Sequence, residues 1–325
     1  MTPATGSPPT HAVVAVHPPA GATPLRAAGA EGGDGGDGGD GGDGGDGEQN
    51  GAWGNGVRAT ARIRAEHNGR ATTLPLLHSD GPFHLRRLRS SGGRARVSVI
   101  GAMSAPLGGD RLALDITART RAELEVTTAA ATIALRGPTT DPAGYDVRLT
   151  ADENASLTWL PQPLISTHGS TLHQTYTVDL AASSRLLLRE EQLLGRTAEP
   201  PGHLTTRLTV RRAGRLILDQ HTAYGVPAIA WDGPAVLGGH RACGQLLVVT
   251  PEPHSIEEPV HLGEDPADGC AVLAPLADAR ALLTTAIAPT PARLRLLLDA
   301  ALAVRVPAVS SDRQHRNPMP GGRSY

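Results

Sequence analysis

The chain has 325 residues, of which 39 are Gly and 27 are Pro, and its formal net charge is −2 at pH 7. All 30 basic residues are Arg, which excludes the Schiff-base chemistry of lysine and the phosphate-binding lysine of a P-loop nucleotidase. The length is sufficient to bury a sizeable core, which excludes a mini-protein that depends on disulfides or metals for stability.

The first 55 residues differ from the rest in composition and charge. Residues 31–47 read EGGDGGDGGDGGDGGDG, a three-residue repeat with almost no side chain to bury. Seven acidic residues and one Arg precede Gly56, a net charge of −6, so the remaining body carries +4. This pattern predicts a disordered Gly/Asp-rich tail over 1–55, with a weak carboxylate sink for divalent cations as the alternative. The mildly positive body has only 3 Trp, 4 Tyr and 1 Phe, which argues against a nucleic-acid partner.

Alternation of apolar and polar residues with period two runs through the body. Turn clusters such as Gly108–Asp110 and Ala213–Gly214 separate the runs, and no helical periods lie between them. This pattern predicts an all-β domain over residues 60–222. The alternating runs are 111–116, 123–127, 146–150, 156–160, 172–180, 186–190, 204–210 and 215–220.

The C-terminal third shows a different pattern. Residues 236–250 indicate a further strand pair, and residues 275–288 and 292–306 indicate two helices. Thr290 is a suitable N-cap for the second helix, and Pro291 suits its first position. The polar, Pro- and Gly-rich residues 307–325 predict a flexible C-terminal tail.

A leucine stripe marks one face of the second predicted helix. Two readings stay open: the stripe packs on the protein's own sheet, or it is a docking face for a partner protein. The stripe consists of Leu294, Leu297, Leu298 and Leu302.

No segment has the character of a membrane span or a secretory signal. The longest apolar region, 282–306, is interrupted by prolines and charged residues, and the N-terminus lacks a basic segment followed by a long apolar run. The two cysteines, Cys243 and Cys270, form no C-x-x-C pair, so a zinc ribbon is excluded. We therefore expect a soluble, cytoplasmic protein.

Catalytic motifs are absent from the sequence. There is no G-x-S-x-G elbow, H-E-x-x-H pair or G-x-G-x-x-G fingerprint. Glu190 and Glu191 are adjacent, so on a strand they face opposite sides and cannot cooperate, and the inward one needs a partner such as an Arg. The residues alone therefore favour a binding or scaffolding protein over an enzyme.

The 13 histidines suggest a search for metal ligands, because imidazole suits nickel, zinc and copper. No group of histidines combines close spacing with a third ligand. His240 with Cys243 is the leading candidate pair, since thiolate and imidazole are both transition-metal ligands. The sequence therefore defines no metal site, and we expect no tightly bound cofactor.

Four runs in fixed order resemble the urease accessory protein family UreD, called UreH in some organisms. A glycine-rich turn leads into a strand, a threonine-alanine strand follows, then a W-L-P-Q segment and an E-x-x-x-L-G-R stretch. The likeness covers roughly residues 70–305. The four runs are Pro106–Leu112, Leu124–Thr132, Leu157–Pro163 and Leu188–Arg196.

The resemblance implies a maturation factor without catalytic activity of its own. UreD-like proteins bind apo-urease (UreA, UreB and UreC) and recruit UreF, which holds the GTPase UreG. Nickel arrives with the GTPase or through the metallochaperone UreE, and only transient Ni²⁺ contact is implied for this chain. The family fold is mainly β, a β-helix-like stack of strands with two C-terminal α-helices, here over residues 56–306.

The resemblance implies that the motif residues shape the family fold or an internal tunnel. The chain departs from the family at three places: Ala129 stands where a Gln is usual, Ile133 where a Lys is usual, and Pro200–Gly202 where the family commonly has an acidic residue in a Gly-Glu pair. The motif residues are Gly109, Asp110, Thr128, Trp159, Pro161, Gln162, Glu190 and Arg196.

Two further functions remain open as alternatives. A β-solenoid carbohydrate-active enzyme needs two carboxylates about 5 to 10 Å apart in a groove. A nickel- or zinc-buffering protein would use the Gly/Asp tail and the histidines.

Overall fold

The computed structural model describes residues 56–305, and the predicted tails over 1–55 and 307–325 lie outside these residues. The described chain is mainly β, as the sequence predicts. Its elements are β1 (Arg58–His67), β2 (Thr72–His78), β3 (Phe83–Ser91), β4 (Arg94–Gly101), β5 (Arg111–Ala118), β6 (Glu123–Thr128), β7 (Thr132–Ala134), β8 (Ala143–Ala151), β9 (Ser156–Leu160), β10 (Leu164–Ser166), β11 (Thr171–Leu180), β12 (Arg185–Leu194), β13 (His203–Arg212), β14 (Arg215–Tyr224), β15 (Ala242–Val249), β16 (Val260–Leu262), a 3-10 turn (Pro266–Asp268), β17 (Cys270–Pro275), β18 (Ala281–Ala288) and α1 (Pro291–Arg305).

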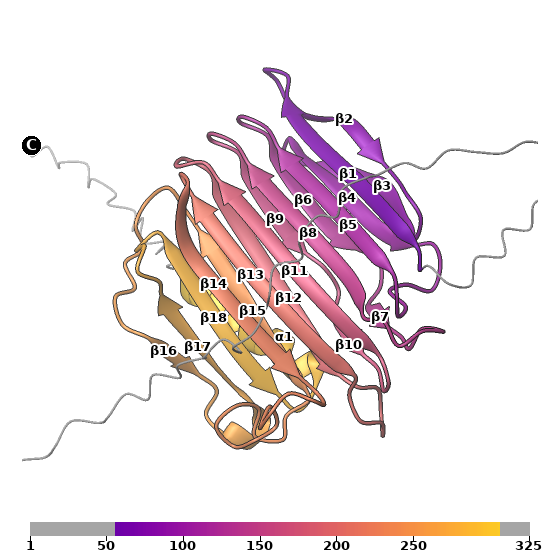
Figure 1. Cartoon of the computed structure of the whole chain (residues 1–325). Helices are drawn as coiled ribbons and strands as arrows, with labels where there is room; N and C mark the ends of the chain where they lie inside the picture. Colours follow the sequence, from indigo (N-terminus) through magenta and orange to yellow (C-terminus); the bar gives the residue numbers. More distant parts are fainter. Residues whose placement is uncertain (1–55, 306–325) are drawn as a thin grey trace, which may run out of the picture. The chain divides into compact units, whose positions relative to one another are not determined.

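The strands form two sheets that face each other across the core (Figure 1). The seven-stranded sheet has the order β14-β13-β11-β8-β5-β1-β2. The eleven-stranded sheet has the path β16-β17-β18-β15-β12-β9-β6-β4-β3, with the short strands β7 and β10 beside it. Between β4 and β13 the chain alternates between the sheets, and neighbouring strands within each sheet are parallel. This winding is a β-solenoid-like stack.

The parallel ladders keep their register from coil to coil, so buried side chains stack in rows. One row of the seven-stranded sheet runs through Ala61, Leu114, Val147, Tyr176 and Leu208. All five are buried, because every second residue of a strand points to the same face. The period-two pattern of the sequence therefore shows which residues of each strand point into one continuous core.

The ladders of the eleven-stranded sheet are interrupted at one level, which we call the seam: residues 128–131, 161–163 and 189–191. Pairing of β9 with β12 ends at Trp159 and Leu188, and pairing of β10 with β12 starts at Leu164 and Gln192. Pro161 and Pro163 have no N–H to donate to a ladder, which explains why β9 ends there. The seam lies where three of the four motif runs cross the sheet.

The C-terminal third differs from its sequence-based prediction in two places. Residues 275–288 are not a helix, because they contain the end of β17 and all of β18. Residues 236–250 contain one strand, β15, preceded by turns. β18 is covered on both faces, by the core and by α1, so its apolar residues show no clean alternation and their period is ambiguous.

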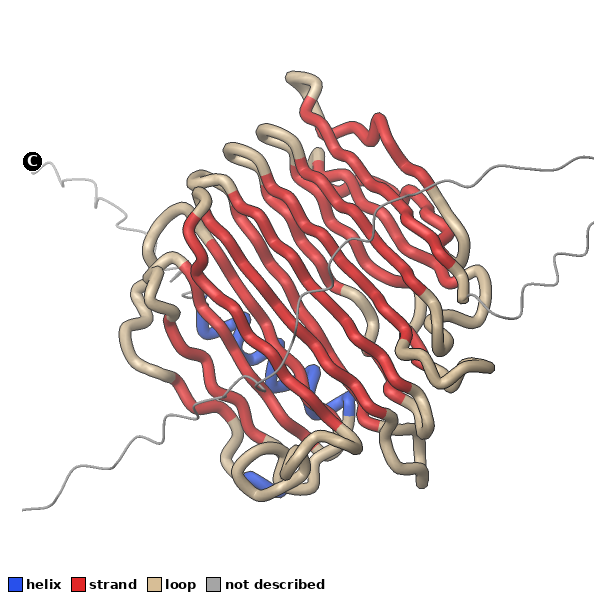
Figure 2. Tube along the Cα trace, in the orientation of Figure 1, coloured by secondary structure: helices blue, strands red, loops and turns tan. Residues whose placement is uncertain are grey.

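The single helix of the described residues, α1, packs on the eleven-stranded sheet (Figure 2). Leu294, Leu297 and Leu298 are buried against β15 and β18, and Leu302 packs at the edge of the same cluster. Of the two readings of the stripe, packing on the protein's own sheet is the one the structure has. The stripe is therefore not an exposed docking face. Within residues 56–305, no helix has the length and apolarity needed to cross a bilayer.

Replacement of Leu114 by Ala tests the stacked core. Its side chain is fully buried in the row described above, so the variant should lose about 2 to 5 kcal/mol of unfolding free energy. Urea unfolding followed by circular dichroism measures this loss. Leu216→Ala is the control, because Leu216 is 56% exposed and its truncation should change stability by less than about 0.5 kcal/mol. Equal losses in both variants would contradict the stacked core.

Candidate functional site

Polar side chains replace aliphatic ones in the core at the level of the seam. From the seven-stranded sheet come Gln174 and Tyr176 of β11, and the amide of Gln174 donates to the Tyr176 hydroxyl at 3.1 Å. From β12 of the facing sheet come Glu190 and Gln192, both buried. The result is a polar interior chamber within an otherwise apolar solenoid core.

Glu190 is the acidic residue of this chamber. Burial raises the pKa of its carboxyl group to about 7, and hydrogen bonds from Gln245 and Tyr176 partly oppose this rise. The Gln245 amide donates to Oε2, whereas Oε1 is buried without a hydrogen-bond partner among the described residues. The sequence-based expectation of an Arg partner for the inward Glu was wrong, because a neutral amide takes that place.

The chamber contains a small cavity. Its volume is about 20 Å³, which is room for about one water molecule. Glu190 lines this cavity, and its buried Oε1 has no hydrogen-bond partner among the described residues. A buried acceptor without a partner on a cavity of this size fits a bound water.

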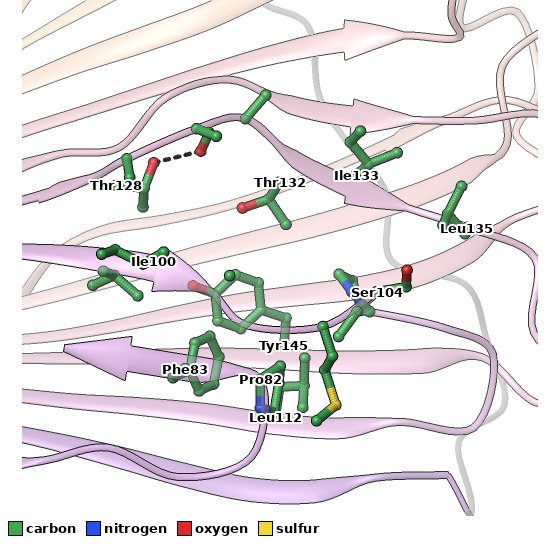
Figure 3. Close-up of a pocket in the computed structure, with 18 residues that line it drawn as sticks. Pro82, Phe83, Ile100, Ser104, Leu112, Thr128, Thr132, Ile133, Leu135 and Tyr145 are labelled. Atoms are coloured by element: carbon green, nitrogen blue, oxygen red, sulfur yellow. Dashed lines mark hydrogen bonds between the residues drawn. The ribbon is translucent and has the colours of Figure 1, made fainter.

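A larger hollow opens next to the chamber (Figure 3). We call this hollow the mouth. It has a volume of about 270 Å³ and is bounded by β4, the loop that follows β4, and residues 128–133. Its walls are mainly apolar, with Phe83, Ile100 and Met103 among them. Thr128, Thr132 and Tyr145 line both the mouth and the chamber, and we call these three residues the neck.

Hydrogen bonds of the seam hold the neck in place. The Thr128 hydroxyl donates to the carbonyl of Ala130 at 2.9 Å, drawn in Figure 3, and accepts from the backbone N–H of Gln162 at 2.8 Å. Thr132 N–H donates to the carbonyl of Pro163 at 3.0 Å. Side-chain and backbone bonds thus replace the ladder where the prolines interrupt it.

Five of the eight motif residues line the chamber: Thr128, Trp159, Pro161, Gln162 and Glu190. They come from three segments, around residues 128, 159–162 and 190, and the parallel register places these segments at one level of adjacent coils. Ala129 and Ile133, which depart from the family, both line the mouth.

The other three motif residues lie outside the chamber. Gly109 has a φ of 92° in a tight turn, and the Asp110 carboxylate accepts from the N–H groups of Val57 and Leu107, each at 2.8 Å. Arg196 pairs with Glu199 at 2.9 Å, and this arginine lowers the pKa of the Glu199 carboxyl to about 2. These residues shape turns, and Arg196 does not reach Glu190.

The candidate metal pair does not come together. The Cys243 thiol is buried in the core and donates to Gln192 at 3.5 Å, whereas His240 Nε2 lies 2.9 Å from the carbonyl of Pro266 in a loop. Burial raises the pKa of Cys243 to about 12, which keeps the thiol protonated and a poor metal ligand. Within residues 56–305, no three His, Cys, Asp or Glu side chains form a metal-binding group.

Sequence reasoning missed Tyr145, Gln174, Tyr176 and Gln245. The available signal was the alternation of β11, in which Gln174 occupies an inward position between Leu172 and Val178. A polar residue at an inward position needs a polar partner across the core.

Comparison with known proteins finds one family over most of the chain. Residues 57–318 match the family model described as "UreD urease accessory protein". The chain is 60% identical over 255 residues to a Saccharopolyspora erythraea protein named "Urease accessory protein UreD 2", which covers 78% of this chain and 90% of that protein.

A Streptomyces coelicolor protein named "Urease accessory protein UreD" is 53% identical over 250 residues, or 76% of this chain and 96% of that protein. The chain belongs to the UreD family of urease accessory proteins. The resemblance carried by the four runs is thereby confirmed, and urease maturation is the role that this family supports.

A catalytic carboxylate pair is not formed by the adjacent glutamates. Glu190 points into the chamber, whereas Glu191 points to the outer face and is held by Arg189 at 2.7 Å and Arg295 at 3.1 Å. The two carboxylates therefore lie in different environments on opposite sides of β12.

The raised pKa of Glu190 predicts a pH-dependent stability. The folded protein binds the carboxyl proton more tightly than the unfolded chain, so this group stabilises the fold at low pH. Stability is lost as pH rises from about 4.5 to about 7, by a few kcal/mol. Glu190→Gln removes the ionisable group, so its stability relative to the wild type should increase between pH 5 and pH 8.

Urea unfolding of both proteins at each pH measures this difference. Glu199→Gln is the control, because Glu199 lies outside the chamber, paired with Arg196, and its pKa is shifted in the opposite direction. A stability difference between wild type and Glu190→Gln that stays constant with pH would show that Glu190 ionises normally.

Proposed function

We propose that this UreD protein is a non-catalytic scaffold of urease maturation that binds apo-urease and recruits UreF and the GTPase UreG for nickel insertion. The supporting observation is the chamber, because five family-motif residues from three separate segments of the chain line one polar cavity in the core. Its place of action is the cytoplasm. UreE is the proposed nickel donor.

The chamber and its mouth are the proposed route by which nickel passes this subunit. Free Ni²⁺ competes poorly with Cu²⁺ at most protein sites, so delivery requires a chaperoned path. A relay needs weak, exchangeable ligands, since a closed structural site would retain the ion. The chamber offers one carboxylate without an arginine partner, Glu190, besides the arginine-paired Glu191, together with amide oxygens and hydroxyl groups, which fits a transient contact rather than a resident cofactor.

The proposed function predicts that urease depends on this chain for nickel. The cognate urease subunits and the other accessory proteins are co-expressed in nickel medium with and without it. We expect both activity and bound nickel to be lost without this chain. Urease that matures equally well without it would refute the proposed function.

The proposed route predicts that filling the neck blocks nickel transfer. Thr132 lines both the mouth and the chamber, so Thr132→Phe should place a ring between them. We expect several-fold less nickel in urease with the accessory complex still assembled, measured by metal analysis and by co-purification.

Thr209→Phe is the matched control, because Thr209 lies on the outer face of the seven-stranded sheet beside Asp219, away from the neck. Full nickel loading with Thr132→Phe in an intact complex would exclude the mouth as the entrance while leaving the scaffold role in place.

A further inference from the structure

The chamber has a second wall that faces α1 rather than the mouth. At the seam, Gln162 and Glu191 line the cavity, and their side-chain oxygens meet a guanidinium group from the helix. Arg295 donates from Nη2 to Gln162 Oε1 at 3.3 Å and to Glu191 Oε2 at 3.1 Å, and from Nε to Glu191 Oε1 at 3.2 Å. One side chain of α1 therefore bridges the two residues.

Arg295 spans the distance between solvent and the cavity wall. Its side chain is 43% exposed, whereas the side chain of Glu191 beneath it is 2% exposed. The backbone around the gap lacks a continuous ladder, because Pro161 and Pro163 interrupt the strand on that side. What closes the wall here is a set of side chains rather than a sheet.

A second arginine ties the helix to the same carboxylate. Arg189 lies 2.7 Å from Glu191 Oε1, and it also donates to Asp299 at 2.7 Å and to the backbone carbonyl of Arg295 at 3.2 Å. Glu191 thus keeps a charge partner when Arg295 is removed, so loss of Arg295 does not leave a buried unpaired charge. The position of α1 and the closure of the wall are linked through these contacts.

We propose that Arg295 is a latch that closes a second port of the chamber beneath α1. A shift of α1 that withdraws the guanidinium opens the port and exposes the oxygens of Glu191 and Gln162. Carboxylate and amide oxygens are ligands for small divalent cations. In the closed state the guanidinium group of Arg295 occupies the position next to these oxygens. The latch goes beyond the proposed function and does not depend on it, because it concerns access to the chamber alone.

A cysteine next to the chamber allows access to the chamber to be measured. Cys243 is buried and its thiol contacts Gln192, which lines the chamber. In a Cys270→Ser background, Cys243 is the single cysteine, and its labelling by methyl methanethiosulfonate measures entry of a small reagent. Arg295→Met removes the latch and keeps the aliphatic stem of the side chain.

Arg293→Met is the matched control on the same helix, because Arg293 donates to the carbonyl of Asp268 at 3.1 Å and makes no contact with the seam. We expect labelling of Cys243 to be about tenfold faster in Arg295→Met than in Arg293→Met, with little dependence on low urea concentrations. Local opening of a port gives this weak urea dependence, because it exposes little surface.

Two results would overturn the latch. One is an Arg295→Met protein that labels no faster than Arg293→Met. The other is faster labelling that increases with urea as steeply as global unfolding does, which would mean that the substitution acts on overall stability. Neither result bears on urease maturation, so failure of the latch and failure of the proposed function are distinguishable.

Discussion

Two prolines on either side of Gln162 impose the constraint on which the interior of this protein depends. A proline cannot donate to a β ladder, so the parallel sheet is interrupted between β9 and β10 while β12 continues past the gap. Within the gap, the backbone N–H of Gln162 donates a hydrogen bond to the Thr128 hydroxyl instead of to a neighbouring strand. The interruption lies at the level where Gln174, Tyr176 and Glu190 bring polar groups into the core.

The parallel register turns this local interruption into a site. Because each coil lies directly on the previous one, an interruption in one coil is next to the corresponding segment of its neighbours. Thr128, Gln162 and Glu190 therefore meet although more than 25 residues separate each from the next. The same register extends the site toward both surfaces, to the mouth through Thr132 and to α1 through Glu191.

The solenoid core was predictable from the sequence, and the polar chamber was only partly so. Alternation in runs such as Arg111–Ala118 identifies a strand and shows which of its residues face the core, since the side-chain period of a strand is two. The segment Ala281–Ala288 was misread as helix because both of its faces are covered, which removes the alternation. Adjacency predicted that Glu190 and Glu191 face opposite sides, but which of them points inward was not predicted, and the partner of each depends on which distant strand or helix lies opposite. Gln245 and Arg295 supply those partners from segments about 55 and 104 residues away, and no local pattern encodes that pairing.

The two glutamates show how a parallel sheet separates functions along one strand. Glu191 lies between two guanidinium groups on the outer face and contributes to fixing α1. Glu190 lies one residue away among neutral groups, where burial raises the pKa of its carboxyl to about 7. The two carboxyl groups therefore differ in what surrounds them: arginine pairing keeps Glu191 in an ionic network with α1, whereas Glu190 has a neutral amide at the place where a charge partner would stand.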